Sequence, residues 1–167
     1  MQSDLLSLDE AINKIKSYFQ KIGNEDIFLK DALGRCLAKP IISNVDNPKY
    51  DVSSMDGYAI NYKDYFDVRD SKIKKFKIVG ESSAGLPYSK KINSLETVRI
   101  FTGAKLPKGS NTVIIQENVK VSKSGSYIII DESPKKSQFV RKKGLDFKKN
   151  NIIFKEGTIL KSRHLGS

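Results

Sequence analysis

Two short segments place a polar side chain beside a glycine at the end of an expected strand. Asp56 comes just before residues 57–61, and Thr102 comes just after residues 97–101 and just before Gly103. A carboxylate at such a position can orient water, accept a proton or bind a magnesium ion that bridges phosphates. A threonine hydroxyl with main-chain N–H groups beside a glycine can bind an anion. Taken alone, an Asx turn at Asp56 and an ordinary loop at Thr102 are simpler interpretations, and local chemistry leaves both alternatives open.

The neighbours of these two residues add charge and backbone freedom. Gly57 permits a positive φ directly after Asp56. Arg99 lies three residues before Thr102, and it either supplies positive charge to that loop or points the opposite way.

A second candidate pair and two single residues lie elsewhere in the chain. Arg141 and Asp146 combine a basic cluster with a carboxylate after a glycine, which suits either a phosphate contact or a surface salt bridge. His164 is the single histidine and stands in a polar context, so we expect it to be solvated. Cys36 is the single cysteine, which excludes an internal disulfide and a multi-cysteine zinc site.

The N-terminal elements that must support these residues are predicted to be helical. Ser7 and Glu10 form a capping box, and apolar residues recur at helical spacing from 8 to 22, where Gly23 follows as a stop signal. A short strand at 26–29 and a two-turn helix at 31–38 are expected next.

After this point the sequence predicts strands and no further helix. Short apolar or alternating runs are separated by Gly, Pro, Asn and Ser, which favours a barrel or sandwich over a parallel α/β sheet. The fold class is therefore mainly β, α+β overall, with an irregular β-barrel-like domain, a small flanking β-rich domain and an N-terminal amphipathic helix. The expected strands are 57–61, 73–79, 97–101, 112–116, 118–122, 127–131, 139–141, 151–154 and 158–160. Residues 119–130 are expected to form a hairpin that turns at 123–125.

Composition excludes some functions and leaves others open. The chain has 167 residues, 38% of them hydrophobic, and no apolar run approaches the ~20 residues that a membrane span needs. The first residues lack the pattern of a signal peptide, so we expect a cytoplasmic protein without membrane contact. The net charge of +11 is compatible with nucleic acid, but only 5 of the 30 basic residues are Arg and no aromatic residues interleave with them. Solvated surface charge is the favoured interpretation, and an anionic small-molecule partner remains compatible with it.

Taken together, the motifs resemble those of the molybdopterin molybdenumtransferase family, to which gephyrin is related. The resemblance rests on four segments in order, together with the capped N-terminal helix. They are Asp51 through Ala59 with Met-Asp-Gly-Tyr-Ala, Arg99 through Gly109 with Thr-Gly-Ala, Val113 through Glu117, and Val140 through Asp146. Leu145 replaces the Glu usual in the family, and Phe101 replaces a Met.

The resemblance implies an enzyme of molybdenum-cofactor biosynthesis that inserts molybdate into adenylylated molybdopterin with Mg²⁺ and releases AMP. It implies that Asp56 positions the metal or the attacking oxygen and that Thr102 holds an oxyanion. Arg141 and Asp146 would support the edge of the cleft. The residues expected to bind the cofactor are Ser54, Gly57, Gly103, Arg141 and Asp146; the metal ligands are not assigned.

The resemblance also implies a domain division and partners. It divides the chain into an N-terminal helix (1–25), a small flanking domain (26–44 and 138–167) and a β-rich domain (45–137). The family's large α/β domain is absent from these 167 residues. We therefore expect the chain alone to be inactive and the apolar stripe of residues 8–22 to be exposed or repacked. Homodimerisation, a small anionic pterin substrate and contact with the molybdopterin adenylyltransferase are further expectations.

Two alternatives remain open at this point. The same β domain could be a non-catalytic dimerising or scaffold module of the family. It could also be a basic nucleic-acid-binding β domain, the less favoured alternative.

Overall fold

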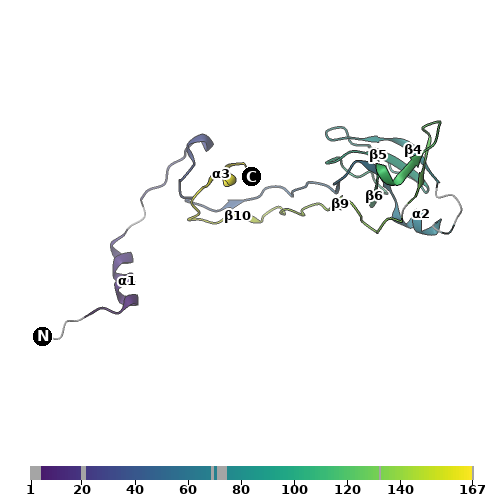
Figure 1. Cartoon of the computed structure of the whole chain (residues 1–167). Helices are drawn as coiled ribbons and strands as arrows, with labels where there is room; N and C mark the ends of the chain where they lie inside the picture. Colours follow the sequence, from purple (N-terminus) through teal and green to yellow (C-terminus); the bar gives the residue numbers. More distant parts are fainter. Residues whose placement is uncertain (1–4, 20–21, 69, 71–74, 132, 167) are drawn as a thin grey trace. The chain divides into compact units, whose positions relative to one another are not determined.

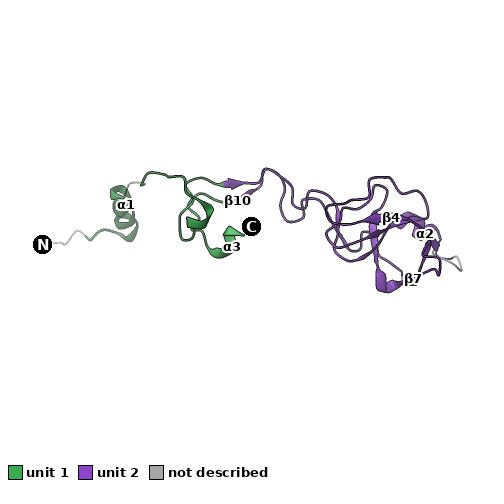
Figure 2. Ribbon diagram, turned by 90° about the horizontal axis from the view of Figure 1, so that it is seen from above, with its two compact units in different colours: residues 1–40, 154–167 green, residues 41–153 purple. Residues whose placement is uncertain are grey.

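A computed structural model describes residues 5–19, 22–68, 70, 75–131 and 133–166 (Figure 1). The chain separates into two units, residues 1–40 with 154–167, and residues 41–153 (Figure 2). The predicted three-part division at residues 25, 44 and 138 stays a prediction, and each unit is described by itself.

The first unit opens with the predicted amphipathic helix. Helix α1 spans Leu8–Tyr18, and the Ser7 hydroxyl accepts a hydrogen bond from the Glu10 main chain while the Glu10 carboxylate accepts from the Ser7 main chain at 2.8 Å. The capping box is confirmed, but Phe19 is already extended, so the helix is shorter than the predicted 8–22. None of its residues is buried, and the apolar stripe is exposed as expected: Leu8, Ile12, Ile15 and Tyr18.

The rest of the first unit corrects two predictions. The expected strand at 26–29 and the expected helix at 31–38 are both absent, and a 3₁₀ turn, η1, at Leu29–Asp31 overlaps that helix only at Asp31. Gly34 has a φ of 78°, a left-handed conformation that interrupts a helix, and its N–H donates to the Leu160 carbonyl at 2.8 Å. Cys36 then pairs with Ile159 as an antiparallel bridge, so main-chain groups that a helix would use are bonded to the C-terminal segment. Helix α3, Ser162–Leu165, was not predicted.

The second unit contains a six-stranded sheet, which confirms the mainly β fold class. Its order is β6-β3-β5-β4-β8-β7; only the β4–β5 neighbours are parallel, and each other pair is antiparallel. The hairpin predicted between 119 and 130 is present as β7 and β8. The strands are β3 Gly57–Ile60, β4 Lys75–Ser82, β5 Glu96–Ile100, β6 Thr112–Ile115, β7 Val119–Val121 and β8 Tyr127–Ile130. The expected strand at 73–79 begins in residues 73 and 74, which lie outside the described residues.

A short helix in this unit contradicts the prediction that no helix follows Leu37. Helix α2 spans Tyr62–Asp67 and starts where the Asn61 side chain accepts from the Lys63 N–H at 3.0 Å. It is too short to give a helical hydrophobic period, and the buried Tyr65 is its anchor in the core. A second 3₁₀ turn, η2 at Gln116–Asn118, follows β6 directly.

Two clusters of buried side chains fix the sheet. The larger cluster joins β3, α2, β4, β6 and β8 through Tyr58, Ile60, Tyr65, Phe76, Ile114, Ile128 and Ile130. The smaller cluster joins β3, β5 and β6 to the loop after β5 through Ala59, Ile100, Ala104, Leu106 and Val113. Strand β3 contributes to both clusters because successive side chains of a strand point to opposite faces.

Two segments far apart in sequence, 41–53 and 140–153, run side by side as an antiparallel ribbon (Figure 2). Its strand pairs are β1 (Ile41–Ile42) with β10 (Ile152–Phe154), and β2 (Val52–Ser53) with β9 (Val140–Arg141). Between these pairs, the Asn47 N–H donates to the Phe147 carbonyl at 2.8 Å. The ribbon therefore delivers residues 54–56 to the start of β3.

At Gly57 the backbones of β3 and β6 approach too closely to leave room for a side chain. A Cβ atom added to Gly57 would lie 2.0 Å from the Ile114 carbonyl oxygen on β6. Its φ is not positive, so the reason for glycine is close backbone approach and not the positive φ that the sequence suggested. The position of Asp56, one residue earlier, depends on this approach.

We predict that Gly57→Ala destabilises the second unit by about 3 kcal/mol or more, because the added methyl group forces β3 away from β6. Urea unfolding of the full chain, followed by circular dichroism, measures this change. Gly125→Ala is the matched control, since Gly125 has a φ of 70° but no atom within 4 Å of an added Cβ. It should cost only ~1 kcal/mol of backbone strain, and equal losses in the two variants would contradict the clash.

Candidate functional site

The structure brings the two leading candidates, Asp56 and Thr102, into direct contact. Gly57 pairs with Ile100 in the antiparallel β3–β5 ladder, so the residues flanking these strand ends are neighbours. The main-chain N–H and the hydroxyl of Thr102 both donate to Oδ1 of Asp56 at 2.8 Å. The site is therefore a carboxylate held at one end of the sheet by the turn that follows β5, the strand paired with β3.

These contacts stabilise the ionised form of the Asp56 carboxyl group. The main-chain hydrogen bond from Thr102, then its hydroxyl and then the nearby Arg99 guanidinium, lower the pKa of the Asp56 carboxyl below its ordinary value of 3.8. Within the described residues, Oδ2 of Asp56 accepts no hydrogen bond. Asp56 thus presents an ionised oxygen, whereas both Thr102 donors are already directed at Asp56.

Gln116 is a neighbour that the sequence motifs did not single out as a site residue. Its main-chain N–H donates to the Asp56 carbonyl at 3.2 Å, and its side-chain oxygen accepts from the Arg99 guanidinium. Arg99 itself lies over the rings of Tyr58 and Phe101, at 5.0 and 5.1 Å from their centroids. Of the two alternatives for Arg99, the structure favours the supply of charge. The signal was present in the motif Val113 through Glu117, which ends at this turn.

The predicted residues Ser54 and Gly103 lie on the segment that precedes Asp56 and on the turn that holds it. The Ser54 N–H donates to the Phe139 carbonyl at 3.0 Å, and the Gly103 N–H donates to the Ser53 carbonyl at 2.8 Å. Gly103 has a φ of 80°, which allows the turn after Thr102 to reverse. Both residues fix the backbone around the carboxylate.

Arg141 and Asp146 form a second, separate pair. One terminal nitrogen of Arg141 contacts Oδ1 and Oδ2 of Asp146 at 2.6 and 2.8 Å, and Asn47 donates to Oδ2 at 3.3 Å. Arg141 is the register partner of Val52 in the β2–β9 pair. Within the described contacts, this pair does not bond to Asp56 or Thr102; it closes the ribbon that leads to them.

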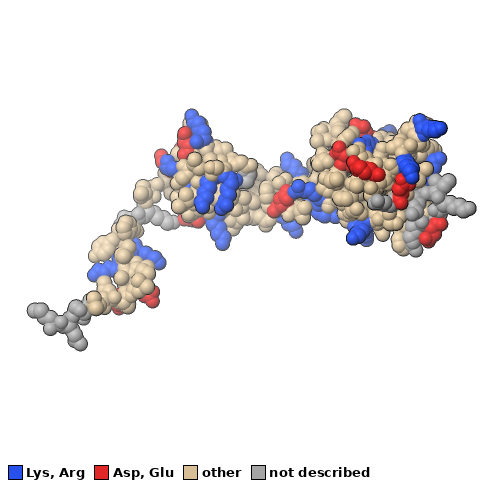
Figure 3. All heavy atoms as spheres, in the orientation of Figure 1, with Lys and Arg blue, Asp and Glu red and all other residues tan. Residues whose placement is uncertain are grey.

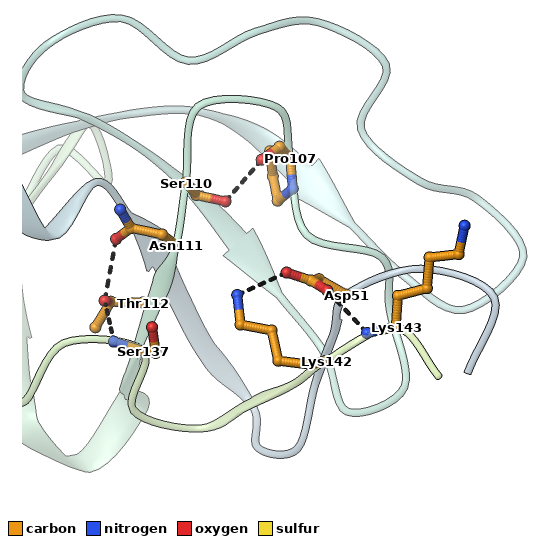
Figure 4. A network of polar contacts seen from close by, with 8 residues as sticks. All are labelled: Asp51, Pro107, Ser110, Asn111, Thr112, Ser137, Lys142 and Lys143. Atoms are coloured by element: carbon orange, nitrogen blue, oxygen red, sulfur yellow. Dashed lines mark hydrogen bonds and ion pairs between the residues drawn. The ribbon is translucent and has the colours of Figure 1, made fainter. Parts of the chain in front are cut away.

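Further ion pairs brace the same ribbon, as Figure 4 shows for Asp51. The Asp51 carboxylate accepts from Nζ of Lys142 at 2.8 Å and from the main-chain N–H of Lys143 at 2.9 Å. Burial raises the pKa of the Asp51 carboxyl, but these hydrogen bonds outweigh burial and lower it. Nζ of Lys143 also lies 3.2 Å from Oδ2 of Asp46, which makes a further ion pair. Three of the seven Lys and Arg side chains between 135 and 149 are thus paired with carboxylates: Arg141, Lys142 and Lys143. Figure 3 shows both signs of charge on the face that it draws.

The remaining features give no second site. His164 is half-buried and packs on Phe154, with ring centroids 4.8 Å apart, so the expectation that it is solvated is wrong. A hollow of ~30 Å³ beside β6, lined in part by Val113, Ser133 and Gln138, has room for a single water molecule. Nowhere in the described part of the chain do three or more His, Cys, Asp or Glu side chains gather into a metal-binding group. No helix among the described residues has the length and apolar character needed to cross a bilayer.

Known proteins resemble this chain over almost its whole length. Residues 6–167 match the family model described as MoeA N-terminal region (domain I and II). Over 157 residues the chain is 34% identical to the molybdopterin molybdenumtransferase of Haemophilus influenzae, which is 93% of this chain and 37% of the relative. The molybdopterin molybdenumtransferase of Nostoc sp. is 33% identical over 141 residues, 84% of this chain and 32% of the relative.

Solved structures agree with these relatives. The crystal structure of a molybdopterin biosynthesis MoeA protein from Pyrococcus horikoshii superposes with a TM-score of 0.81 at 29% identity, covering 98% of this chain and 41% of that one. A second structure of the protein from this organism gives a TM-score of 0.78 at 32% identity, covering 85% and 37%. This chain thus spans between 32% and 37% of the length of the two curated relatives.

The motif resemblance is confirmed by the family model, the curated relatives and the solved structures alike. The chain belongs to the family described as the MoeA N-terminal region, and its relatives are molybdopterin molybdenumtransferases.

Proposed function

We propose that this chain supplies one side of a site at which molybdate is inserted into adenylylated molybdopterin with release of AMP. The observation that carries the proposal is the ionised Asp56 carboxylate at a sheet end, in a chain of this family. Thr102 donates to this carboxylate, and Gln116 donates to the main-chain carbonyl of Asp56. Because the chain covers about a third of its curated relatives, residues 1–167 alone are proposed to be inactive.

In this proposal Asp56 positions the metal or the attacking oxygen, and its Oδ2 is the atom that faces the ligand. The donors of Thr102 support a positioning role, since its N–H and hydroxyl are both bonded to Oδ1 of Asp56. The oxyanion role predicted for Thr102 requires its hydroxyl to turn away from Asp56 when substrate binds. Ser54, Gly57 and Gly103 shape the backbone around the carboxylate.

The donor set near Asp56 is compatible with Mg²⁺ only in a restricted way. Mg²⁺ takes oxygen ligands and is often held by one or two carboxylates together with substrate phosphates. Asp56 supplies one such carboxylate, which suits a magnesium ion shared with the substrate and not a cage built from protein groups. When bound, the ion would neutralise negative charge on phosphate oxygens.

The Arg141–Asp146 pair is proposed to act at the edge of this site. Each partner satisfies the other within the segment 140–153, and Asn47 joins Asp146 to the opposite arm of the ribbon. Homodimerisation, contact with the molybdopterin adenylyltransferase and a cytoplasmic location are proposed from the family resemblance alone.

Two alternatives differ from this proposal in their requirements. A scaffold module would need the fold of the second unit but not the charge of Asp56. A nucleic-acid-binding domain would need free basic side chains, whereas Arg141, Lys142 and Lys143 are paired with carboxylates. Steep salt dependence of binding to generic DNA would favour the latter alternative.

We predict that the pKa of Asp56 in the full chain lies below its ordinary value of 3.8, so that the ionised form predominates above that pH. Because its pKa is lowered on folding, its contribution to stability is present above pH 3.8 and is lost as the pH falls through the folded-state pKa. Carboxyl ¹³C NMR across this range measures the value. Thr102→Val should raise the pKa of Asp56 by removing one donor, and Thr102→Ser should leave it nearly unchanged; identical values in all three proteins would refute the anchoring.

We also predict that Asp56→Asn abolishes molybdenum-cofactor synthesis, because the amide keeps the size of the side chain but removes its charge. The whole encoded protein is expressed in a bacterial strain that lacks its own molybdopterin molybdenumtransferase, and the activity of a molybdoenzyme is measured.

Asp67→Asn is the control, since Asp67 is an exposed carboxylate on α2, which follows β3 at the end opposite to Asp56. It should retain full activity. If Asp56→Asn also retained activity at equal protein levels, the catalytic proposal would fail and the scaffold alternative would be preferred.

A further inference from the structure

Arg99 is held on several sides beside the candidate site, although no predicted role depends on it. It lies in β5, opposite Tyr58 of β3 in the antiparallel ladder and level with Glu81 of β4. Cross-strand partners share one face of a sheet, so its guanidinium extends over the Tyr58 ring. The guanidinium also lies over the ring of Phe101, the residue that follows β5. Arginine has a planar cation that stacks on aromatic rings, which a lysine ammonium does less well.

The guanidinium is also tied to the turn that holds Asp56. It donates to the side-chain oxygen of Gln116, and the main-chain N–H of Gln116 donates to the Asp56 carbonyl at 3.2 Å. Arg99 is therefore connected to the main chain of Asp56 through Gln116.

Two carboxylates belong to residues next to these contacts. Glu81 is the register neighbour of Arg99 on β4, and Glu117 on η2 accepts a hydrogen bond from Nε2 of Gln116 at 3.1 Å. The guanidinium of Arg99 bonds to Gln116, which lies at the end of the sheet where Asp56 is found.

We propose that Arg99 is a positioning residue of the site, which uses its guanidinium over Tyr58 and Phe101 and its bond to Gln116 to fix the backbone of Asp56. This inference rests on the proposed function for its catalytic consequence, but the positioning itself can be measured without activity. It assigns a role to the arginine of the motif from Arg99 through Gly109 and to the turn at Gln116.

The test compares three variants of the full chain by NMR. Arg99→Met keeps an unbranched apolar side chain over Tyr58 and Phe101 but removes the charge and the donors. Arg99→Lys restores the charge without the planar stack. Lys75→Met is the matched control, because Lys75 lies over the Tyr127 ring at 3.8 Å and has no contact with Asp56. Amide spectra first establish that each variant is folded.

The expected result in Arg99→Met is a changed amide shift at Gln116, whose N–H is bonded to the Asp56 carbonyl, together with a changed amide shift at Asp56. Arg99→Lys should also leave the Gln116 shift altered, because lysine lacks the planar guanidinium. Lys75→Met should change neither shift. A folded Arg99→Met protein with unchanged shifts at Gln116 and Asp56 would overturn the inference, and Arg99→Lys decides the same question if Arg99→Met does not fold: an unchanged Gln116 shift then overturns it.

The same variants in the whole encoded protein separate this inference from the proposed function. In the complementation assay, Arg99→Met should lower molybdoenzyme activity by roughly 10- to 100-fold, the scale of a displaced catalytic group. Arg99→Lys should retain more activity than Arg99→Met. If Asp56→Asn is fully active, the proposed function fails, whereas the NMR result still decides whether Arg99 positions Asp56.

Discussion

The close approach of β3 to β6 at Gly57 sets the geometry of everything around the candidate site. With no side chain at this residue, the backbone of β3 can lie against the Ile114 carbonyl, and its register with both β5 and β6 is then fixed. That register puts Asp56 next to Thr102 on one side and next to Gln116 on the other. The polar contacts of the site therefore depend on the close approach of two backbones at Gly57, one residue after Asp56.

The sequence predicted those parts of the molecule whose signals are local and strong. The capping box at Ser7 and Glu10, the hairpin between β7 and β8 and the mainly β class each depend on residues a few positions apart. Asp56 and Thr102 could also be named, because the motifs around them were recognisable. Their mutual contact could not, since it depends on which strands pair, and nothing in the two segments states that pairing.

The errors arise where contacts that a hydrophobic period does not record decide the local structure. Residues 31–38 have a helical pattern, yet Gly34 and Cys36 are bonded to the C-terminal segment. Helix α2 forms although it is too short to show a period, because Asn61 caps it and Tyr65 is buried. Gln116 was overlooked because its main-chain bond to Asp56 and its side-chain bond to Arg99 both depend on which strands pair.

The ribbon of residues 41–53 and 140–153 has a consequence for the order of folding. The hydrogen bonds and ion pairs that its side chains make across the ribbon join residues 91 to 103 positions apart, such as Asp51 with Lys142 and Asp46 with Lys149. Closing so long a loop of unfolded chain is entropically costly, but a folded sheet brings the two ends of residues 57–130 close together beforehand. We therefore expect the sheet to form first. The two arms of the ribbon should then pair progressively, starting at the sheet and continuing away from it. Pulse-labelling hydrogen exchange should then show protection of β3 and β5 before that of β2 and β9, so that the site around Asp56 is assembled where the early and late parts of the fold meet.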